Sequence, residues 1–152
     1  MANDTPDEGE APVIVSVADA AMHMYTAAIE SLPDPSDGEF ASRAAVVLSG
    51  LRKLEAALSQ AANRNRATPA VIVALSGVRT SYDELAETAA DGPGSTLGQR
   101  LYLTRKRTKL SAQEAANGAG LRLDLIQAIE AEEPATEDES TKIKALITAL
   151  GG

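Results

Sequence analysis

The sequence LGQRLYLTRKRTKLSAQEAANGAGLRLDLIQAIE, from Leu97 to Glu130, decides how this chain is expected to fold. Thr96 stands directly before it and is followed three positions later by Gln99, and Ser111 is followed in the same way by Glu114. In such a capping box each side chain satisfies a free backbone amide at the start of a helix. The stretch therefore predicts two helix starts a short distance apart.

The helices predicted from these starts are short. The first is expected over 96–109 and the second over 111–120, where it ends in a glycine turn. A third helix is predicted over about 122–131 and a last one over about 140–150. Two short helices joined by a tight glycine turn are typical of a helix-turn-helix, so 96–152 is predicted to be such a domain.

Charge is unevenly distributed along this part of the chain. Between Leu97 and Arg122 six basic residues face one acid, Glu114, which gives a local charge of +5 in a chain of net charge −8. The following stretch, 123–139, holds seven acids and no base. A basic strip on an acidic protein can hold a polyanion while the remaining surface limits unspecific contacts. The basic residues are Arg100, Arg105, Lys106, Arg107, Lys109 and Arg122.

Longer helices are predicted before this domain, because apolar residues recur there at steps of three and four. The expected fold is an all-α chain with an amino-terminal three-helix segment, 13–91, which forms either an up-down-up bundle or a bundle completed by a second copy. The first stripe is Ile14, Val17, Ala21, Met24 and Ala28. The second is Phe40, Ala44, Val47, Leu51, Leu54, Leu58 and Ala61, after a capping box at Ser36 and Glu39. The third is Val71, Leu75, Val78, Tyr82, Leu85 and Ala89, with Thr68 as cap and Pro69 as first helical residue.

The second stripe also predicts self-association, because three uninterrupted heptads are typical of a coiled-coil seam. The predicted dimer seam consists of Val47, Leu51, Leu54 and Leu58. We therefore expect a homodimer in which 13–91 is the dimerisation domain. The same amino-terminal helices are the expected place for a further protein partner.

Composition sets the outer limits of the domains. Residues 1–12 are acidic, proline-containing and poor in apolar side chains, which predicts a disordered tail. The run Asp91-Gly92-Pro93-Gly94 ends the third helix and predicts a linker over 92–95.

At Leu97–Glu130 the chain resembles the XRE family, the lambda and Cro repressor-like DNA-binding domains. The resemblance rests on Leu97-Gly98 with Arg100, on Leu110-Ser111, and on Ala119-Gly120-Leu121 at the turn. With the last helix it covers about a third of the chain. It implies that the carboxy-terminal part is a lambda-repressor-like helix-turn-helix bundle.

In that family the third helix enters the major groove and the start of the second helix meets the phosphate backbone. The resemblance implies that Arg122, Asp124 and Gln127 face base edges, and that Ser111 and Gln113 approach phosphates. Further phosphate contacts are expected from Lys106, Arg107 and Lys109. The family also pairs an arginine of the first helix with the glutamate that ends the third. The matching residues, Arg105 and Glu130, are expected to form an ion pair that fixes the helix angle.

Some residues depart from the family's pattern and leave a second interpretation open. Leu123 and Leu125 occupy commonly polar positions of the third helix, Thr104 a usually apolar one of the first, and Lys109 replaces a frequent glycine. A third helix with two leucines could equally bind protein. The segment LRLDLIQAIEAEEP also resembles the helix-turn-helix of RodZ-like cell-shape proteins, which grips a protein filament, so a soluble adaptor is the alternative function.

Composition also excludes several kinds of chemistry. The chain has no cysteine, which excludes thiol catalysis and thiolate metal sites, and His23 is its only histidine. No Ser, His and Asp triad and no zinc site can be assembled from these residues. We expect a protein that is not an enzyme and has no catalytic residues, metal or cofactor.

Location is predicted from what the chain lacks. No apolar run is expected to approach the ~18 to 20 residues that span a bilayer, and the amino terminus is acidic, unlike a signal peptide. We therefore expect a cytoplasmic protein without membrane contact. Its expected partner is double-stranded DNA in the bacterial nucleoid, where it would act as a transcriptional regulator or nucleoid-associated protein.

Overall fold

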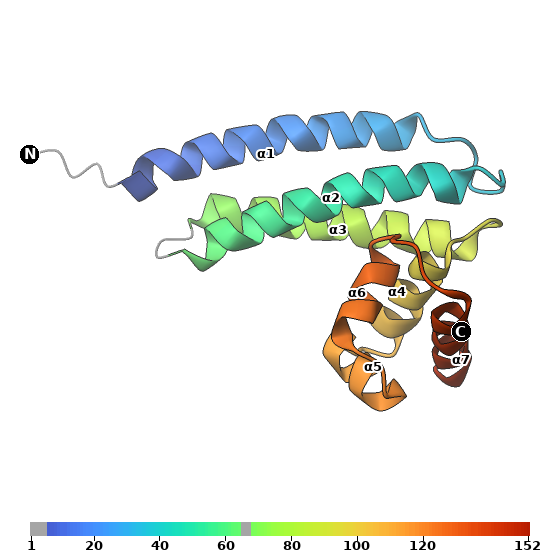
Figure 1. Cartoon of the computed structure of the whole chain (residues 1–152). Helices are drawn as coiled ribbons and strands as arrows, with labels where there is room; N and C mark the ends of the chain where they lie inside the picture. Colours follow the sequence, from blue (N-terminus) through green and yellow to red (C-terminus); the bar gives the residue numbers. More distant parts are fainter. Residues whose placement is uncertain (1–5, 65–67) are drawn as a thin grey trace, which may run out of the picture. The chain divides into compact units, whose positions relative to one another are not determined.

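The computed structural model describes the backbone of residues 6–64 and 68–152, and the side chains of 12–64 and 68–152. Over these residues the chain is all-α, with seven helices and no strand (Figure 1). The predicted fold class is therefore confirmed. The helices are α1 (Pro6–Glu30), α2 (Phe40–Asn63), α3 (Pro69–Asp91), α4 (Leu97–Arg107), α5 (Ala112–Ala119), α6 (Leu123–Glu130) and α7 (Glu137–Ala149).

The chain divides into two compact units. The first unit is Met1–Leu32 with Val46–Leu85, and the second is Pro33–Ala45 with Ala86–Gly152. The division thus falls within α2 and α3, and not at 92–95, where the sequence predicts a linker between domains.

Close contacts explain why the predicted linker lies inside the second unit. A Cβ on Gly94, whose φ is +76°, would lie 2.6 Å from the carbonyl oxygen of Gly38. The buried side chain of Gln99 donates from Nε2 to the carbonyl oxygen of Ala41 at 2.8 Å. These contacts hold the turn and the start of α4 against the start of α2.

The amino-terminal helix begins earlier than the sequence suggests. α1 starts at Pro6, so the predicted disordered tail over 1–12 is wrong for 6–12, while 1–5 lie outside the described residues. Proline suits the first helical position because its fixed φ is helical and its missing N–H would be unpaired there anyway. A second proline, Pro12, lies inside α1 and removes one backbone hydrogen bond from it.

In the first unit α1, α2 and α3 lie side by side (Figure 1). Gly50 of α2 leaves room for Tyr25 of α1, since a Cβ at Gly50 would be 2.6 Å from the tyrosine ring. Polar links join α2 to α3. Arg52 donates to the Tyr82 hydroxyl at 2.7 Å and lies 5.5 Å from the centre of its ring.

The apolar stripe predicted for the third helix is confirmed, because all six of its residues are buried. Its predicted start is confirmed as well. α3 begins at Pro69, and the hydroxyl of Thr68 accepts a hydrogen bond from the Val71 amide at 3.4 Å.

The predicted dimer seam is used inside the chain instead. Val47, Leu51 and Leu58 are 8%, 0% and 1% exposed, and Leu54 is half-buried. Val47, Leu51 and Leu58 are therefore not available to a second copy, and the predicted four-residue seam is wrong. Heptad spacing describes any helix with one buried face, and here that face is covered within one protomer.

The predicted inner face of the first helix is also wrong in part. Val17 and Met24 are 62% and 72% exposed, whereas Ala18 is 3% exposed. α1 is apolar on more than one side, so residue spacing alone does not decide which side is buried.

The same apolar character makes α1 a candidate membrane span. Within the described residues, Pro12–Glu30 is one helical segment long and apolar enough to cross a membrane by length and composition, and 6% of it is buried. The expectation that no apolar run approaches that length is therefore wrong. Core helices of soluble proteins and signal sequences near an amino terminus meet the same criterion.

The second unit is built on four short helices. α4 packs against α6 and α7, and α5 packs against α6. Capping boxes form at Thr96 with Gln99 and at Ser111 with Glu114, as predicted. The buried core consists of Leu101, Ala116, Ile126, Ile129, Ile143 and Ile147.

Candidate nucleic-acid interface

The pair α5 and α6 is set by the turn between them. α5 ends at Ala119, and Gly120 follows in the left-handed region with φ +66°. Such a backbone conformation favours glycine, because a Cβ would crowd the carbonyl oxygen. α6 begins at Leu123 after Arg122, which takes the N-cap position without a side-chain cap hydrogen bond.

One side of α6 is buried and the other is exposed. Ile126 and Ile129 are 0% and 4% exposed and lie in the core of the second unit. The three residues expected to meet base edges, Arg122, Asp124 and Gln127, are all exposed. The orientation of α6 therefore leaves these side chains accessible to a ligand.

Arg122 and Asp124 form an ion pair at the start of α6. Arg122 Nε lies 3.4 Å from Asp124 Oδ1, and the two side chains are 81% and 70% exposed. A pair this exposed contributes little to stability and can be exchanged for another partner. Either group is thus able to turn towards a base edge.

The two leucines of α6 are not surface anchors. Leu123 and Leu125 are half-buried and pack against the buried core cluster. Their presence at commonly polar positions is therefore explained by packing within the second unit.

The amino end of α5 is fixed by its capping box. The Ser111 hydroxyl accepts from the Glu114 amide at 3.0 Å, and Glu114 Oε1 accepts from the Ser111 amide at 2.9 Å. The bond from the Ser111 amide, and then the contact with its hydroxyl, hold the pKa of Glu114 below its ordinary value. Ser111 is exposed, so a phosphate oxygen can approach its hydroxyl.

Gln113, the other predicted phosphate contact of α5, is exposed and has a partner on its own helix. Its Nε2 donates to Asn117 Oδ1 at 2.8 Å, one helical turn later. Each amide also has hydrogen-bonding capacity beyond this contact. Asn117 is a residue of this face that the sequence did not single out, although its spacing of four from Gln113 would have placed it there.

The three predicted phosphate-binding cations differ in their surroundings. Lys106 and Lys109 are exposed, and the Lys106 ammonium lies 5.7 Å from the centre of the Tyr102 ring. Lys109 has a φ of +60°, in the left-handed region that favours glycine.

Arg107 is engaged by carboxylates at the end of α3. It lies 3.4 Å from Asp91 and 3.8 Å from Glu87, and all three side chains are more than half exposed. The predicted phosphate contact at Arg107 would have to replace these ion pairs. Glu87 and Asp91 were not predicted to bear on the site, because only the fold brings the end of α3 to α4.

The predicted structural ion pair between Arg105 and Glu130 is present. Arg105 donates from Nε at 2.8 Å and from a terminal nitrogen at 2.7 Å to the two Glu130 oxygens, and their side chains are 12% and 10% exposed. The other terminal nitrogen donates to the Leu110 carbonyl at 2.9 Å. The pair links α4 to the end of α6 and to the residue before the α5 cap.

The described residues contain no metal-binding cluster. No group of three or more His, Asp or Glu side chains there could hold a metal ion. His23, the single histidine, is exposed on α1.

Two comparisons locate the chain among known proteins. The family model MSMEG_6518_N, described as an N-terminal domain, matches residues 25–96. An uncharacterized protein of Mycolicibacterium smegmatis is 70% identical over 129 residues, which is 85% of this chain and all of that protein. This all-α chain therefore belongs to the family of the Mycolicibacterium smegmatis protein. No solved structure matches it.

Proposed function

We propose that the protein binds duplex DNA through α5 and α6, as a transcriptional regulator or nucleoid-associated protein. The observation that carries the proposal is the outer side of α6, where Arg122, Asp124 and Gln127 are all exposed while the leucines between them pack inward. Arg and Gln match the hydrogen-bonding edges of guanine and adenine, and Asp matches the amino group of cytosine.

The charge around this face supports the same proposal. Lys106 and Lys109 are exposed at the end of α4 and in the connection to α5, next to Ser111. Because DNA affinity depends mainly on phosphate neutralisation, this basic strip would supply most of the binding free energy. The resemblance of Leu97–Glu130 to XRE domains points to the same orientation, with α6 in the major groove.

The adaptor alternative draws less support. It requires the leucines of α6 to contact another protein, but Leu123 and Leu125 are half-buried against the core. Homodimerisation also stays a proposal, now without the α2 seam. A two-fold dimer would bind a palindromic site with half-sites about 34 Å apart.

The test is a fluorescence-anisotropy titration of the full chain with random-sequence and selected duplexes at several salt concentrations. If about five phosphates are neutralised, log affinity should fall against log salt with a slope near −4 to −5. Arg122→Ala should reduce the preference for the selected duplex, whereas Lys106→Ala should weaken both duplexes alike. The absence of binding at low salt would refute the proposal.

The ion pairs of Arg107 provide a sharper test. Neutralising its partners with Glu87→Gln and Asp91→Asn should raise DNA affinity and steepen the salt slope by about one unit, because Arg107 becomes available to phosphate. The matched control is Glu137→Gln with Asp138→Asn on α7, which removes the same charge elsewhere. Equal gains in both double variants would mean that net charge alone is responsible.

A further inference from the structure

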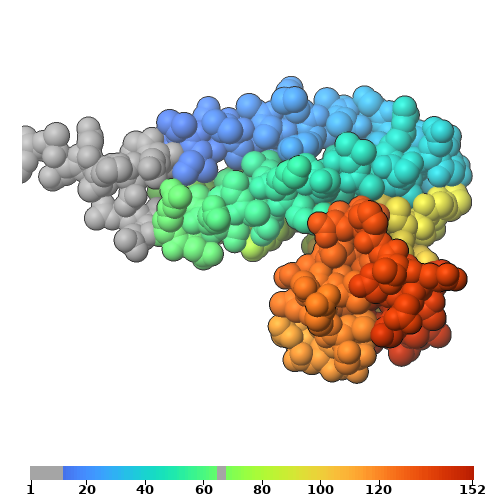
Figure 2. Space-filling view, in the orientation of Figure 1, coloured from blue at the N-terminus to red at the C-terminus, as the bar shows by residue number. Residues whose placement is uncertain are grey.

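The exposed side of α1 carries a line of apolar residues. Val13, Val17 and Met24 are 62%, 62% and 72% exposed, and they are three of six large hydrophobic side chains found exposed in the described part of the chain. Ala20 and Ala27 are exposed as well. We call these five residues the α1 outer stripe; α1 is the blue surface in Figure 2.

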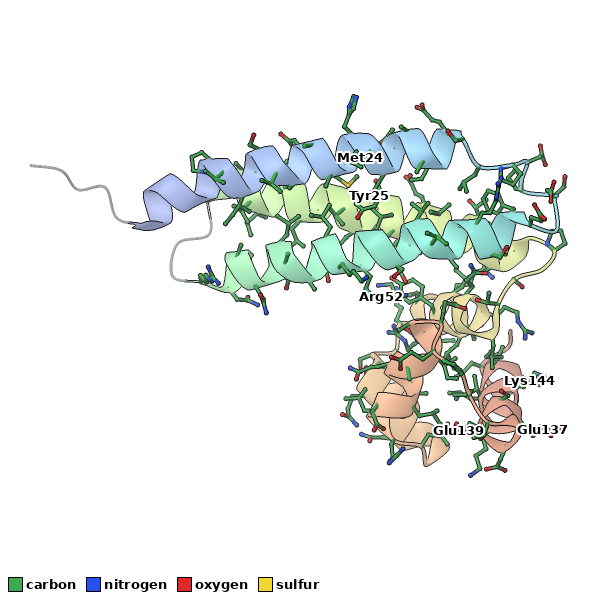
Figure 3. The ribbon with its side chains drawn as sticks, turned by 45° about the horizontal axis from the view of Figure 1, so that its top comes forward. Met24, Tyr25, Arg52, Glu137, Glu139 and Lys144 are labelled. Atoms are coloured by element: carbon green, nitrogen blue, oxygen red, sulfur yellow. The ribbon has the colours of Figure 1, made fainter. Side chains whose placement is uncertain are left out.

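The spacing within the stripe is that of a helix-binding seam. Its members follow one another at steps of four, three, four and three, so they form one line along the helix over about 21 Å. The opposite side of α1 is already occupied, since Ala18 is buried and Tyr25 lies against Gly50. Met24 and Tyr25, adjacent in sequence and labelled in Figure 3, thus belong to different sides of the helix.

The polar residues on the exposed side of α1 lie outside the stripe. Between residues 13 and 30 the other exposed residues are all polar and follow a second line, also at steps of three and four. They are Ser16, Asp19, His23, Thr26 and Glu30. At about 100° per residue, the two acids lie roughly 100° or more around the helix from the middle of the stripe. The stripe is therefore an uncharged face, and no charge on a partner is needed to cover it.

The stripe is complementary to itself when two copies of α1 lie antiparallel and cross at Ala20. Val13 of one copy then faces Ala27 of the other, so a larger side chain meets a smaller one. In the same pairing Val17 faces Met24. Ala20 meets its own copy, and two methyl groups at the crossing point allow the helices to approach closely. A contact between two identical surfaces is what a two-fold dimer requires.

The charges of α1 favour a second copy over a membrane surface. Helices that lie on membranes carry Lys or Arg on their polar face, and residues 12–30 contain neither. In the antiparallel pair Asp19 points away from the seam, so the seam itself contains no charged side chain of the described residues. Two copies can therefore bury the stripe without burying a carboxylate.

We propose that the α1 outer stripe is the interface of an antiparallel homodimer in which two copies of α1 pair around Ala20. This gives the proposed homodimer an interface in place of the α2 seam, and it does not depend on DNA binding by the second unit. A paired segment about 21 Å long buries less than the ~1,600 Å² of a standard interface. The dimer is therefore expected to dissociate at micromolar concentrations.

Sedimentation equilibrium of the full chain, at up to about 0.5 mM, tests for the dimer. Val17→Ala with Met24→Ala should weaken association at least tenfold, and alanine preserves the helix. The matched control, Ile72→Ala with Val73→Ala, alters two exposed apolar residues of α3 and should leave association unchanged. A chain that stays monomeric at every concentration, or an equal loss in the control, would overturn the proposal.

Salt dependence gives a second readout of the same association. Each chain has a net charge of −8, and the seam contains no ion pair that salt could weaken. Added salt should therefore leave the dimer unchanged or strengthen it. Association that weakens at least tenfold between low and high salt would mean that charged groups hold the copies together, and would overturn the proposal.

Cysteine cross-linking locates the crossing point, because the chain has no cysteine of its own. Ala20→Cys should form a disulfide-linked dimer with oxidised glutathione, since the two residues meet at the crossing point. Thr26→Cys, on the polar side of α1, is the matched control and should cross-link at least tenfold more slowly. Equal rates for the two variants would overturn the proposal.

Mixed cysteine variants determine the orientation. Val17→Cys should cross-link with Met24→Cys when the two variants are mixed. Val17→Cys alone should not, because the two copies of residue 17 would be about 9 Å apart along the helices, too far for a disulfide. Cross-linking of Val17→Cys alone, as fast as in the mixture, would indicate a parallel pair and overturn the antiparallel dimer.

One further measurement tests a lipid surface as the occupant. The full chain should stay in solution when phosphatidylcholine vesicles are sedimented, at protein concentrations where it is dimeric. Co-sedimentation that Val17→Ala with Met24→Ala abolishes would assign the stripe to a lipid surface and overturn the proposal.

Discussion

The two units order their helices by different means. In the first unit, helices of 23 to 25 residues bury long aliphatic stripes, and the ion pair between Arg79 and Glu55 has side chains 56% and 30% exposed. In the second unit the four helices have 8 to 13 residues, three of them (α4, α5 and α7) start in capping boxes, and the Arg105–Glu130 pair is nearly buried. Because short helices are marginal in water, they depend on specific polar partners, whereas long helices depend mainly on the burial of one side.

The largest expected effect on the free energy of unfolding comes from breaking the nearly buried ion pair and not the exposed one. Glu130→Gln should lower the free energy of unfolding by about 3 kcal/mol, because it leaves the guanidinium of Arg105 buried without its carboxylate. Glu55→Gln, which breaks the solvent-exposed pair with Arg79, should lower it by less than about 1 kcal/mol. Urea denaturation followed by circular dichroism measures both. Equal losses would mean that the two units do not differ in this respect.

A smaller effect is expected from two glycines at close contacts. A Cβ at Gly98 of α4 would overlap the carbonyl oxygen of Ile129, which cannot move without moving α6. Gly98→Ala should therefore lower the free energy of unfolding by about 2 kcal/mol. A Cβ at Gly50 meets the Tyr25 ring, which can rotate, so Gly50→Ala should cost less.

The Gly50 prediction has an internal control. In a Tyr25→Ala background the ring is absent, so Gly50→Ala should become stabilising through the higher helix propensity of alanine. Thermal unfolding of the single and double variants measures this reversal. If Gly50→Ala proves as costly as Gly98→Ala, the Tyr25 contact is as rigid as a backbone contact.

The smallest expected effect is the loss of the stabilisation by Glu114 at acidic pH. Because the folded state lowers the pKa of Glu114, its capping bond contributes stability above the ordinary glutamate pKa of about 4.3, and this contribution is lost as pH falls through the lowered value. The stability of Glu114→Gln should therefore differ from that of wild type at pH 7 and converge with it as the pH falls through the lowered pKa of Glu114. NMR titration of the Glu114 carboxyl checks the direction, and a pKa at or above 4.3 would contradict it.

The helices of the second unit could be located from the amino-acid sequence, because their starts are marked by local residue patterns. Thr96 with Gln99 and Ser111 with Glu114 form the expected boxes. A third box, Thr136 with Glu139, starts α7 at Glu137, ahead of the predicted 140, and its pattern was present in the sequence.

One of the capping boxes predicted from the sequence, at Ser36 and Glu39, does not form. Ser36 and Glu39 match a box, but the Ser36 amide and hydroxyl bond to Asp34 Oδ1 at 2.9 and 2.6 Å, and α2 begins at Phe40. These bonds, the hydroxyl one first, lower the pKa of Asp34. A nearby aspartate can thus compete for the serine that a box requires.

Long-range features were predicted less well. The Arg105–Glu130 ion pair could be predicted only through the resemblance to XRE domains. The same resemblance implies base contacts by Arg122, Asp124 and Gln127, which requires these side chains to be exposed, and they are. The partners of Arg107 and the buried side of α1 depend on packing between distant segments, which residue spacing does not report.

Lys109 has an exposed ammonium group and a left-handed backbone conformation. The same residue therefore bears on both DNA binding and stability. Glycine would relax that backbone and raise the melting temperature, but it would also delete a positive charge from the proposed DNA-binding surface. Replacing Lys109 by glycine is therefore expected to raise the melting temperature and to lower the affinity for DNA.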